Sequence, residues 1–427
     1  MIKEKKIAIL GLGYVGLPLA VGLSSSYKII GFDISLERIS QLMNGIDKTR
    51  EIKKVDLLRS LNNNLSLTSN YKDLVDCNIF IATVPTPITD NCKPDLRPLK
   101  NVCRIISKIL KPKDIVVFES TVFPGATEEI CGPELEKNKY SLKSGFDFFL
   151  GYSPERVNPG DKVHTLKKIK KITSGSTVKI GRIVDDLYSK IIDAGTHLAS
   201  SIKIAEAAKS IENSQRDINI AFVNELAMMF ERMDIPTKEV LAAAQTKWNF
   251  LSFQPGLVGG HCIGVDPYYL SYIAKKEGID PKMILSARET NDNVPSQIIK
   301  QIKLKLEEKE ITYNQIKICF FGVTFKENVP DIRNSKVADL VKELEKLGFE
   351  VDVYDPLANA SETKEVYGIS LLDQVTGTYA AVVGAVPHSE FRDINPERLL
   401  RSDGLLADIK GIWRGMPLPD KVRYWSL

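Results

Sequence analysis

The sequence lacks the cysteine spacing of a disulfide framework or of a zinc site. Its six cysteines are scattered over 427 residues, and none forms a Cys-x-x-Cys pair. This usage is typical of reduced thiols in the cytosol. No other spacing of metal-ligating side chains occurs, so we expect no bound metal.

Long apolar runs are also missing from the chain. None reaches the roughly 18 residues that a membrane-spanning helix needs. The N-terminal lysines lead directly into the strand-like stretch 7–10, without the pattern of a signal peptide. We therefore expect a cytoplasmic protein with no membrane partner.

The chain has little net charge, only +4 at pH 7. The lysine runs 3–6 and 167–171 are expected to be solvated surface, so no nucleic-acid partner is predicted. Hydrophobic residues make up 43% and charged residues 26%, as in an ordinary globular protein. One hydrophobic core rarely serves a chain of this length, so we expect two or three domains.

A glycine-rich loop follows the first predicted strand. The loop Gly11-Leu12-Gly13-Tyr14-Val15-Gly16 leads into a helical stretch, and a second strand, 28–32, ends in Asp33. In a dinucleotide-binding βαβ unit the glycines permit the tight turn, the approach of the diphosphate and close helix packing, while the acid binds ribose hydroxyls. We predict an NAD site, because a carboxylate would repel the 2′-phosphate of NADP.

Strands and helices continue to alternate after this unit. Strand-like runs at 78–83, 114–118 and 148–151 each end in a polar loop, and Glu155 lies in the last of these loops. Ligands of open parallel sheets bind beyond the carboxyl ends of the strands. These three loops, with Glu155, are therefore candidates for the binding site.

One long helix is predicted for residues 201–233, which contain no proline or glycine and carry apolar side chains at helical spacing. Such a helix suits a link between domains or a dimer interface. Lys209 and Asn213 lie four residues apart and therefore on one face. Taken alone, a lysine such as Lys209 is more often a surface residue than a functional one.

A glycine-flanked cysteine marks the middle of the chain, where Gly259-Gly260-His261-Cys262 is followed by Asp266. Glycines let a ligand approach the backbone. A thiolate there can attack a carbonyl carbon, and the aspartate can orient a proton-transferring partner or a water. A lone cysteine is more often a small buried hydrophobe, but the NAD site supplies an electron acceptor. We interpret His261 as a loop residue rather than the base of the thiol, because adjacent side chains project differently.

The remainder of the chain loosely repeats the α/β pattern of the first part. Predicted helices cover 237–244, 295–310 and 335–347, and predicted strands cover 316–321, 350–354, 380–385 and 405–408. Gly322 has no companion glycines, but Lys326 and Arg333 follow it, a cationic clamp suited to a nucleotide diphosphate. The predicted fold class is α/β, with two Rossmann-like doubly wound domains joined by a long central helix.

With these features described, the chain resembles the UDP-glucose/GDP-mannose dehydrogenase family over nearly its whole length. The resemblance is carried, in order, by Gly11–Gly16, Asp33, Val84–Pro87, Ser120-Thr121, Pro154-Glu155, Lys209 with Asn213, Gly259–Asp266, and Phe325-Lys326 to Arg333. It implies an NAD-binding domain over 1–200, a central helical domain over 201–300 with the dimerisation helix and the cysteine loop, and a UDP-sugar-binding domain over 311–427. A homodimer is implied as well.

The resemblance also implies a four-electron oxidation of a sugar C6 alcohol to a carboxylate with two NAD. The implied catalytic residues are Cys262, Lys209, Asp266, Asn213, Thr121 and Glu155. The implied cofactor-binding residues are Gly11, Gly13, Tyr14, Val15, Gly16, Asp33, Arg38, Thr83, Pro85, Thr86, Ser120, Thr121 and Arg333. The implied substrate-binding residues are Glu155, Arg156, Val157, Lys209, Asn213, Lys247, Phe253, Gly256, Gly259, Phe325 and Lys326.

Two details narrow the expected substrate. UDP-glucose members of the family commonly carry a second glutamate before the glycine of their Pro-Glu-Phe-Leu segment, and Pro159 stands at that position here. The run Lys247–Tyr269 resembles bacterial UDP-N-acetylhexosamine 6-dehydrogenases of Vi-antigen and O-antigen synthesis. We expect UDP-N-acetylglucosamine or its galacto epimer as substrate, for a surface polysaccharide, with UDP-glucose or UDP-N-acetylmannosamine as alternatives.

Two other protein classes share part of this pattern. A β-hydroxyacid dehydrogenase has the N-terminal glycines and a helix lysine, but it needs neither a cysteine loop nor a second α/β domain. A non-catalytic NAD-binding scaffold would be expected to have lost Cys262, Lys209 or Asp266, and all three are present.

Overall fold

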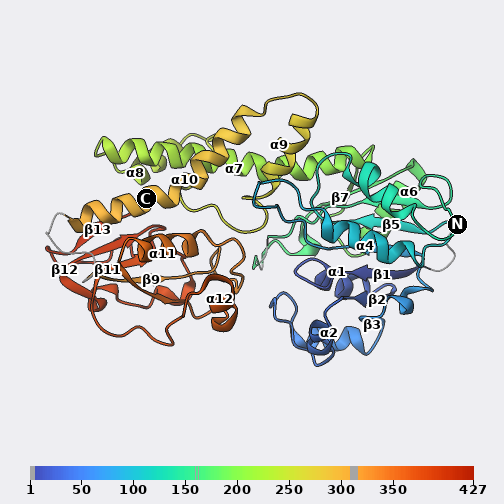
Figure 1. Ribbon diagram of the computed structural model, residues 1–427, viewed down its shortest axis with the longest axis horizontal. Coiled ribbons are helices and arrows are strands. Elements are labelled where there is room, and N and C mark those ends of the chain that lie inside the picture. Colours follow the sequence, from blue (N-terminus) through green and yellow to red (C-terminus); the bar gives the residue numbers. More distant parts are fainter. Residues whose placement is uncertain (1–4, 159, 162, 308–315) are drawn as a thin grey trace. The chain divides into compact units, whose positions relative to one another are not determined.

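The computed structural model describes residues 5–158, 160–161, 163–307 and 316–427. The chain divides into two compact units: unit 1 comprises Met1–Glu212 and Tyr268–Asp280, and unit 2 comprises Asn213–Pro267 and Pro281–Leu427. Helix α7 (Ile202–Arg232) runs without a break from unit 1 into unit 2 (Figure 1). The predicted helix at 201–233 is thus confirmed to within one residue at each end.

Unit 1 is built on an eight-stranded sheet with the order β3-β2-β1-β4-β5-β6-β7-β8. Its strands are β1 (Lys6–Leu10), β2 (Lys28–Phe32), β3 (Leu65–Thr68), β4 (Ile79–Ala82), β5 (Ile115–Phe118), β6 (Phe149–Tyr152), β7 (Lys171–Gly175) and β8 (Thr196–Leu198). Neighbouring strands are parallel except β6 and β7. The first six strands have the 3-2-1-4-5-6 order of a dinucleotide-binding fold, in which the ligand binds where β1 and β4 diverge.

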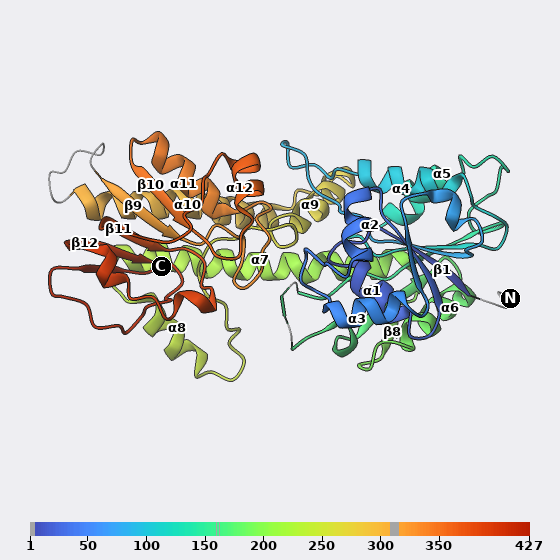
Figure 2. The same cartoon turned by 90° about the horizontal axis from the view of Figure 1, so that it is seen from below.

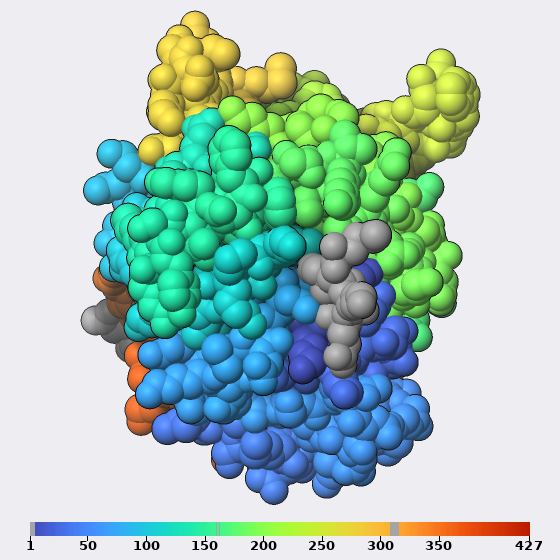
Figure 3. Space-filling view, turned by 90° about the vertical axis from the view of Figure 1, so that its right-hand side faces the viewer, coloured from blue at the N-terminus to red at the C-terminus, as the bar shows by residue number. Residues whose placement is uncertain are grey.

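Helices cover both faces of this sheet. They are α1 (Gly16–Leu23), α2 (Leu36–Met43), α3 (Lys54–Leu61), α4 (Arg97–Ser107), α5 (Gly132–Leu135) and α6 (Val178–Ser189), with short turns η1 (Tyr71–Leu74), η2 (Thr127–Cys131) and η3 (Leu166–Lys168). Figure 2 shows α4 and α5 on one face and α1 and α3 on the other. Apolar side chains of α1, α3 and α6 share one core with β1 and β2. On the face shown in Figure 3, blue and teal segments lie directly against green ones.

Unit 2 contains a second, all-parallel sheet with the order β10-β9-β11-β12-β13. Its strands are β9 (Lys317–Phe321), β10 (Glu350–Tyr354), β11 (Tyr379–Gly384), β12 (Leu400–Asp408) and β13 (Arg423–Trp425). Its helices are α8 (Thr237–Gln245), α10 (Lys282–Glu307), α11 (Lys336–Lys346) and α12 (Ala360–Tyr367), with turns η5 (Ser389–Phe391) and η6 (Pro396–Leu399), and α9 (Asp266–Lys276) begins in unit 2 and continues in unit 1. The predicted fold class, two Rossmann-like units with a long helix, is confirmed.

The first glycine turn of unit 1 has a counterpart in unit 2. Gly11 and Gly322 both have a φ of 99° and follow the first strand of their sheets. Gly11 N donates to Phe32 O at 2.8 Å, and Gly322 N donates to Tyr354 O at 2.9 Å. The two units therefore share the same strand–turn geometry at this point.

The acids that follow the second strand of each sheet differ in their surroundings. Asp33 accepts one backbone N–H on each oxygen, from residues 12 and 35, and stays partly exposed. Asp355 is buried and accepts hydrogen bonds from the backbone N–H groups of Val323, Thr324, Leu357 and Ala358 and lies 3.2 Å from the His388 ring. Burial would raise the pKa of Asp355, but His388 and the N–H groups of Val323 and Thr324 hold it below its ordinary value. Asp355 is thus a structural residue, whereas Asp33 keeps an exposed edge.

Helix α10 begins well before the predicted start at Pro295. It runs from Lys282 to Glu307 with Pro295 in its interior, so the predicted start is wrong, and the predicted end at Glu310 lies outside the described residues. A proline inside a helix forfeits one backbone hydrogen bond. Val294, Ile298 and Ile302 are nearly fully buried on α10, and this apolar burial outweighs the loss.

A buried polar network joins α7, α10 and the segment before the cysteine loop within unit 2. Asn224 of α7 donates to Gly256 O at 3.1 Å and accepts from Gly256 N at 2.7 Å. Its amide also donates to Asn291 of α10 at 2.8 Å, and Asn291 donates to Asp217 Oδ1 at 2.8 Å. Asp217 in turn accepts from Arg288 at 2.6 Å. Because every member is buried and hydrogen-bonded, the network fixes the backbone that leads to Cys262.

Candidate active site

The glycine loop of unit 1 has little room at two of its three glycines. A Cβ at Gly16 would lie 1.8 Å from Gly11 O and 2.5 Å from Thr83 Oγ1. At Gly11 it would lie 3.0 Å from Thr83 O, and the φ of 99° already disfavours other residues. A Cβ at Gly13, by contrast, would meet no atom within 4 Å. The loop therefore packs closely at its ends and leaves space at Gly13, as a diphosphate requires.

A cavity of about 580 Å³ adjoins this loop, within the range of roughly 300 to 1,000 Å³ that small-ligand sites have. Gly11, Asp33, Val84 and Pro85 line it, at the carboxyl ends of β1, β2 and β4. The Asp33 carboxylate is anchored through Leu12 N at 2.9 Å. The open backbone at Gly13, the partly exposed Asp33 and this cavity fit the adenosine diphosphate part of NAD.

Part of the wall of this cavity escaped the sequence reasoning. Ile34, Asp95, Arg97 and Asn101 line it, and Arg97 Nη2 bonds Asp95 Oδ2 at 2.6 Å. Asp95 and Arg97 stand at the start of α4, which follows the loop after β4. The amphipathic pattern of α4 was the signal that could have found them.

Several residues predicted to bind the cofactor form hydrogen bonds to the backbone of the glycine loop or of the loop after β4. Thr83 Oγ1 donates to Gly11 O at 2.7 Å, and Ser120 Oγ donates to Val84 O at 2.6 Å. Arg38 donates to Leu12 O at 2.9 Å and pairs with Asp47 at 2.9 Å. Tyr14 and Val15 precede α1 directly, and Thr86 lies in the loop after β4. Direct contacts of these residues with NAD stay predictions.

The loop that carries Thr121 is held by α7 within unit 1. Glu206 of α7 accepts from Gly125 N at 2.5 Å and from Thr127 N at 2.8 Å, and Ser210 Oγ donates to Val122 O at 3.0 Å. Burial raises the pKa of Glu206 to about 7. Lys209, also on α7, is buried in the same unit.

Glu155 lies in a second polar group of unit 1. Its Oε1 accepts from the N–H groups of Arg156 and Val157, each at 2.6 Å, and its Oε2 accepts from Lys171 Nζ at 3.2 Å. Arg156 itself pairs with Glu212 of α7 at 2.8 Å. The expectation that the run 167–171 is solvated is wrong for Lys171, which is 2% exposed because two carboxylates enclose its ammonium group. Pro159 lies outside the described residues.

In unit 2 the cysteine loop closes onto the start of α9. Cys262 O accepts from Val265 N at 3.0 Å and from Asp266 N at 2.8 Å, so Cys262 stands one turn before the helix. Asn213 Nδ2 donates to Asp266 Oδ2 at 2.5 Å, and both side chains are buried. Cys262 is partly exposed. The structure thus joins the predicted catalytic amide, Asn213, to the predicted carboxylate, Asp266, by a hydrogen bond. The thiol of Cys262 lies four residues before Asp266 in the sequence.

The glycines before Cys262 pack on the loop after β9. A Cβ at Gly260 would lie 2.6 Å from the Phe325 ring, and one at Gly259 would lie 2.7 Å from Asn334 O. Asn334 also donates to Gly260 O at 2.8 Å and accepts from Gly260 N at 3.1 Å. Asn334 was not predicted as a site residue, because nothing in the neighbouring sequence indicates its positive φ of 51°.

The predicted clamp residues lie on the same loop of unit 2. Arg333 is exposed, and its guanidinium bonds Asp331 at 2.6 to 3.1 Å. Lys326 and Phe253 are partly exposed, and Lys247 is exposed. Their contacts with a substrate stay predictions.

Three observations bear on metals, membranes and disulfides. Among the residues that the structure describes, no group of three or more His, Cys, Asp or Glu side chains is placed to hold a metal ion. In the same part of the chain no helix is both long and apolar enough to cross a membrane. The six cysteines, all within the described ranges, form no disulfide.

Three family models match the chain in succession. They describe the NAD binding domain of the UDP-glucose/GDP-mannose dehydrogenase family over residues 5–192, its central domain over 203–293 and its UDP binding domain over 319–415.

Individual relatives align over almost the full length. A UDP-N-acetyl-D-glucosamine 6-dehydrogenase of Pseudomonas aeruginosa is 50% identical over 413 residues, which cover 96% of this chain and 97% of that protein. A protein of the same name from Salmonella typhi is 49% identical over 397 residues, 93% of each chain. The solved structure of a UDP-D-ManNAc dehydrogenase from Pyrococcus horikoshii has a TM-score of 0.89 at 30% identity and covers 98% of both chains.

Proposed function

This chain belongs to the UDP-glucose/GDP-mannose dehydrogenase family, and we propose that it oxidises the C6 hydroxyl of UDP-N-acetylglucosamine to a carboxylate for a surface polysaccharide. The observation that carries this substrate is the identity of about half of all residues, over nearly the whole chain, to two UDP-N-acetyl-D-glucosamine 6-dehydrogenases. Three relatives named for the manno epimer are 31 to 32% identical.

The first oxidation requires a base for the hydroxyl proton and a donor for the developing alkoxide. We assign the base to Asp266 acting through a water, because the Asn213 amide bonds one of its oxygens and fixes its orientation. Lys209 and the Asn213 amide stabilise the alkoxide. When bound, NAD accepts the hydride that leaves C6.

The second oxidation proceeds on the thiol of Cys262. The thiolate adds to the aldehyde and holds it as a thiohemiacetal, and loss of the second hydride gives a thioester. Thr121, Glu155 and Asp266 position the water that hydrolyses this thioester. The turn that bonds Cys262 O to Val265 N and Asp266 N keeps the thiol at a fixed place before α9.

We propose that three parts of the chain have different roles in binding and catalysis. Residues 1–200 bind NAD through the glycine loop and Asp33, residues 201–300 carry the cysteine loop, and residues 311–427 bind the UDP group through Phe325, Lys326 and Arg333. The diphosphate is an anion, and two cations on one loop suit it.

The test is an NADH assay over UDP-N-acetylglucosamine, its galacto and manno epimers, and UDP-glucose. We expect two NADH per sugar and the highest kcat/KM with UDP-N-acetylglucosamine. A pocket built for an N-acetyl group leaves polar groups unpaired when the amide is absent, so UDP-glucose should react poorly. A preference for UDP-glucose would refute the substrate.

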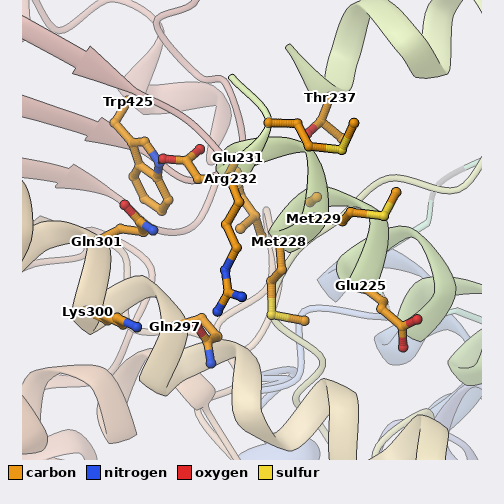
Figure 4. A pocket seen from close by; sticks show the side chains of 13 residues that line it. Glu225, Met228, Met229, Glu231, Arg232, Thr237, Gln297, Lys300, Gln301 and Trp425 are labelled. Carbon is orange, nitrogen blue, oxygen red and sulfur yellow. The ribbon is translucent and has the colours of Figure 1, made fainter. Parts of the chain in front are cut away.

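We further propose a homodimer formed through α7. Four apolar side chains, Ile204, Ile211, Phe222 and Met229, are 46% to 57% exposed and recur after 7, 11 and 7 residues, which places them on one face of the helix. Beside Met229 in unit 2 lies a cavity of about 410 Å³. Figure 4 shows Met228 and Arg232 reaching from α7 toward Gln297 of α10. Adaptable methionines around an exposed apolar face are typical of protein interfaces.

The dimer is tested by light scattering. The wild type should have about twice the chain mass of 47.7 kDa, and Phe222→Glu should be monomeric. Phe146→Glu is the matched control, because Phe146 is 86% exposed and belongs to the loop before β6 rather than to α7. A wild type of single-chain mass would refute the dimer. We place the reaction in the cytoplasm, where thiols such as those of the six cysteines, which form no disulfide, remain reduced.

A further inference from the structure

Four side chains from separate segments meet in the interior of unit 1. Glu119 follows β5, Glu155 follows β6, Lys171 begins β7, and Tyr188 belongs to α6. Lys171 Nζ donates to Glu119 Oε2 at 2.7 Å and to Glu155 Oε2 at 3.2 Å. The Tyr188 hydroxyl donates to Glu119 Oε1, and its ring lies 5.3 Å from the ammonium group. We call these four residues the Lys171 cluster.

The Lys171 cluster joins three strands and a helix through buried charges, which carry a cost in desolvation free energy. Glu119, Lys171 and Tyr188 are at most 2% exposed. Removing charges from water costs several kcal/mol per ion, and apolar residues of similar size usually serve stability as well or better. The cluster therefore calls for a role that apolar side chains would not fill.

The cluster leaves Glu155 at its open end. The Glu155 side chain keeps 13% of its surface exposed, whereas that of Glu119 keeps none. The N–H groups of Arg156 and Val157 hold one Glu155 oxygen, and Lys171 holds the other. Three donors from two directions leave this carboxylate a single orientation.

The same contacts separate the two carboxylates in charge. Burial alone would raise the pKa of Glu155, but the Lys171 charge and the two backbone donors hold it below its ordinary value. Burial raises the pKa of Glu119 despite its bond to Lys171. Burial opposes the charge of Lys171, yet Glu119 and Glu155 keep its pKa above the ordinary value. Two carboxylates with opposite shifts around one ammonium group indicate that Glu155 is the more readily ionised of the two.

We propose that Lys171, held in place by Glu119 and Tyr188, is a positioning residue that fixes the Glu155 carboxylate for the hydrolysis of the Cys262 thioester. This role rests on the proposed function. In that step the water oxygen bonds the carbonyl carbon, one water proton passes to Glu155, the carbon–sulfur bond breaks, and Cys262 leaves as a thiolate beside the carboxylic acid product. No electrons are transferred.

A purely structural role for Lys171 makes a different kinetic prediction. Loss of folded protein lowers every step in the same proportion. Loss of Glu155 positioning slows only hydrolysis, which follows both hydride transfers. The two roles are therefore separated by rapid mixing of enzyme, NAD and UDP-N-acetylglucosamine, with NADH counted per active site.

The test compares Lys171→Met and Lys171→Arg with a matched control, Lys143→Met. Lys143 also pairs with a glutamate of unit 1, Glu136, at 2.9 Å, but at the surface. We expect Lys171→Met to release two NADH per site in a fast burst and then to turn over at least about tenfold more slowly than the wild type. This is less than the roughly 10²- to 10⁴-fold that a general base contributes, because Glu155 is still present but no longer held in place. An acyl adduct on Cys262 should accumulate in the intact-mass spectrum. Lys171→Arg should recover part of the rate, and Lys143→Met should match the wild type.

The pH profile supplies a second readout. The charged and titratable groups around Glu155 are Lys171, Glu119, Tyr188 and Arg156, the last paired with Glu212 of α7. Because Lys171 lowers the pKa of Glu155, its removal should move the acid limb of the steady-state rate to higher pH. A limb that stays in place would contradict the positioning role.

If Lys171→Met does not fold, the double variant Lys171→Met/Glu119→Gln removes the second buried charge as well and leaves Glu155 with its two backbone donors. We expect it to show the same burst and slow turnover. The positioning role is overturned if burst and steady-state rate fall together, or if turnover is unchanged. A wild type that makes no NADH from any UDP-sugar would instead overturn the proposed function, and with it this step.

Discussion

The hydrogen bonds between Asn224 and Gly256 give a prediction that links the core of unit 2 to the cysteine loop. Asn224→Leu keeps a similar size but removes the donor to Gly256 O, the acceptor of Gly256 N and the donor to Asn291. Each buried group left unpaired lowers the free energy of unfolding by about 1 to 3 kcal/mol. The added apolar burial raises it by about 1 to 2 kcal/mol. Three groups, Gly256 O, Gly256 N and Asn291 Oδ1, lose their partner; at about 1.5 kcal/mol each, less the apolar gain, we expect a net loss of about 3 kcal/mol.

Thermal unfolding at a fixed protein concentration measures this loss. For a unit of about 200 residues, about 3 kcal/mol corresponds to a fall in Tm of roughly 6 to 12 °C. Because Gly256 precedes the cysteine loop, KM for the UDP-sugar should rise as well. The control is Asn219→Leu, also on α7, whose amide bonds only the preceding turn at Gln215 O and is exposed. We expect its Tm to change little.

The reasoning would be refuted if Asn224→Leu and Asn219→Leu had equal effects on Tm. It would also be refuted if Asn224→Leu lost stability while KM for the UDP-sugar stayed at the wild-type value. The hydrogen-bond network would then not determine the conformation of the cysteine loop.

Three further predictions concern the ligands. Cys262→Ser should fold and bind both ligands but stall after the first oxidation or at a slow ester, since an alkoxide is a poorer nucleophile and leaving group than a thiolate; four-electron turnover near the wild-type rate would remove the thiol from the mechanism. Asp33 should make NAD far more efficient than NADP in steady-state assays, and Asp33→Asn should narrow the difference because the charge that repels the 2′-phosphate is gone; equal wild-type efficiencies would contradict this. Lys326→Ala should raise KM for the UDP-sugar by about tenfold, as expected for one lost charged hydrogen bond; an unchanged KM for both UDP-sugar and NAD would exclude the clamp.

The local parts of the fold were predictable from the sequence. The strand–glycine–helix pattern at residues 7–16 depends on neighbours in the chain, and β1, β2 and α7 begin and end within about one residue of the predicted limits. Family, fold class, NAD and the class of reaction are confirmed.

What the sequence did not reveal depends on partners far apart in the chain. Helix α10 continues through Pro295 because its apolar side chains are buried in the core of unit 2. Local helix propensity does not indicate this burial. Lys171 looked solvated because it ends a lysine run, but its partner Glu119 lies 52 residues earlier. Asn224 and Gly256 are 32 residues apart, and nothing near either residue marks the pair.

The contrast between Asp33 and Asp355 bears on attempts to redesign the protein. The two units share a strand and a glycine turn with the same φ, so grafting the loop Gly11–Gly16 after β9 looks like a simple way to create a second cofactor site. The graft would fail on the acid, because both oxygens of Asp355 already accept backbone N–H groups and His388 occupies one side. Freeing Asp355 for a ribose would unpair four N–H groups, two of them buried. In two units with the same strand–turn geometry, the acid at this position belongs to the hydrogen-bonded frame in unit 2 and is partly exposed in unit 1, so an engineer would have to rebuild the frame of unit 2 before adding a ligand site.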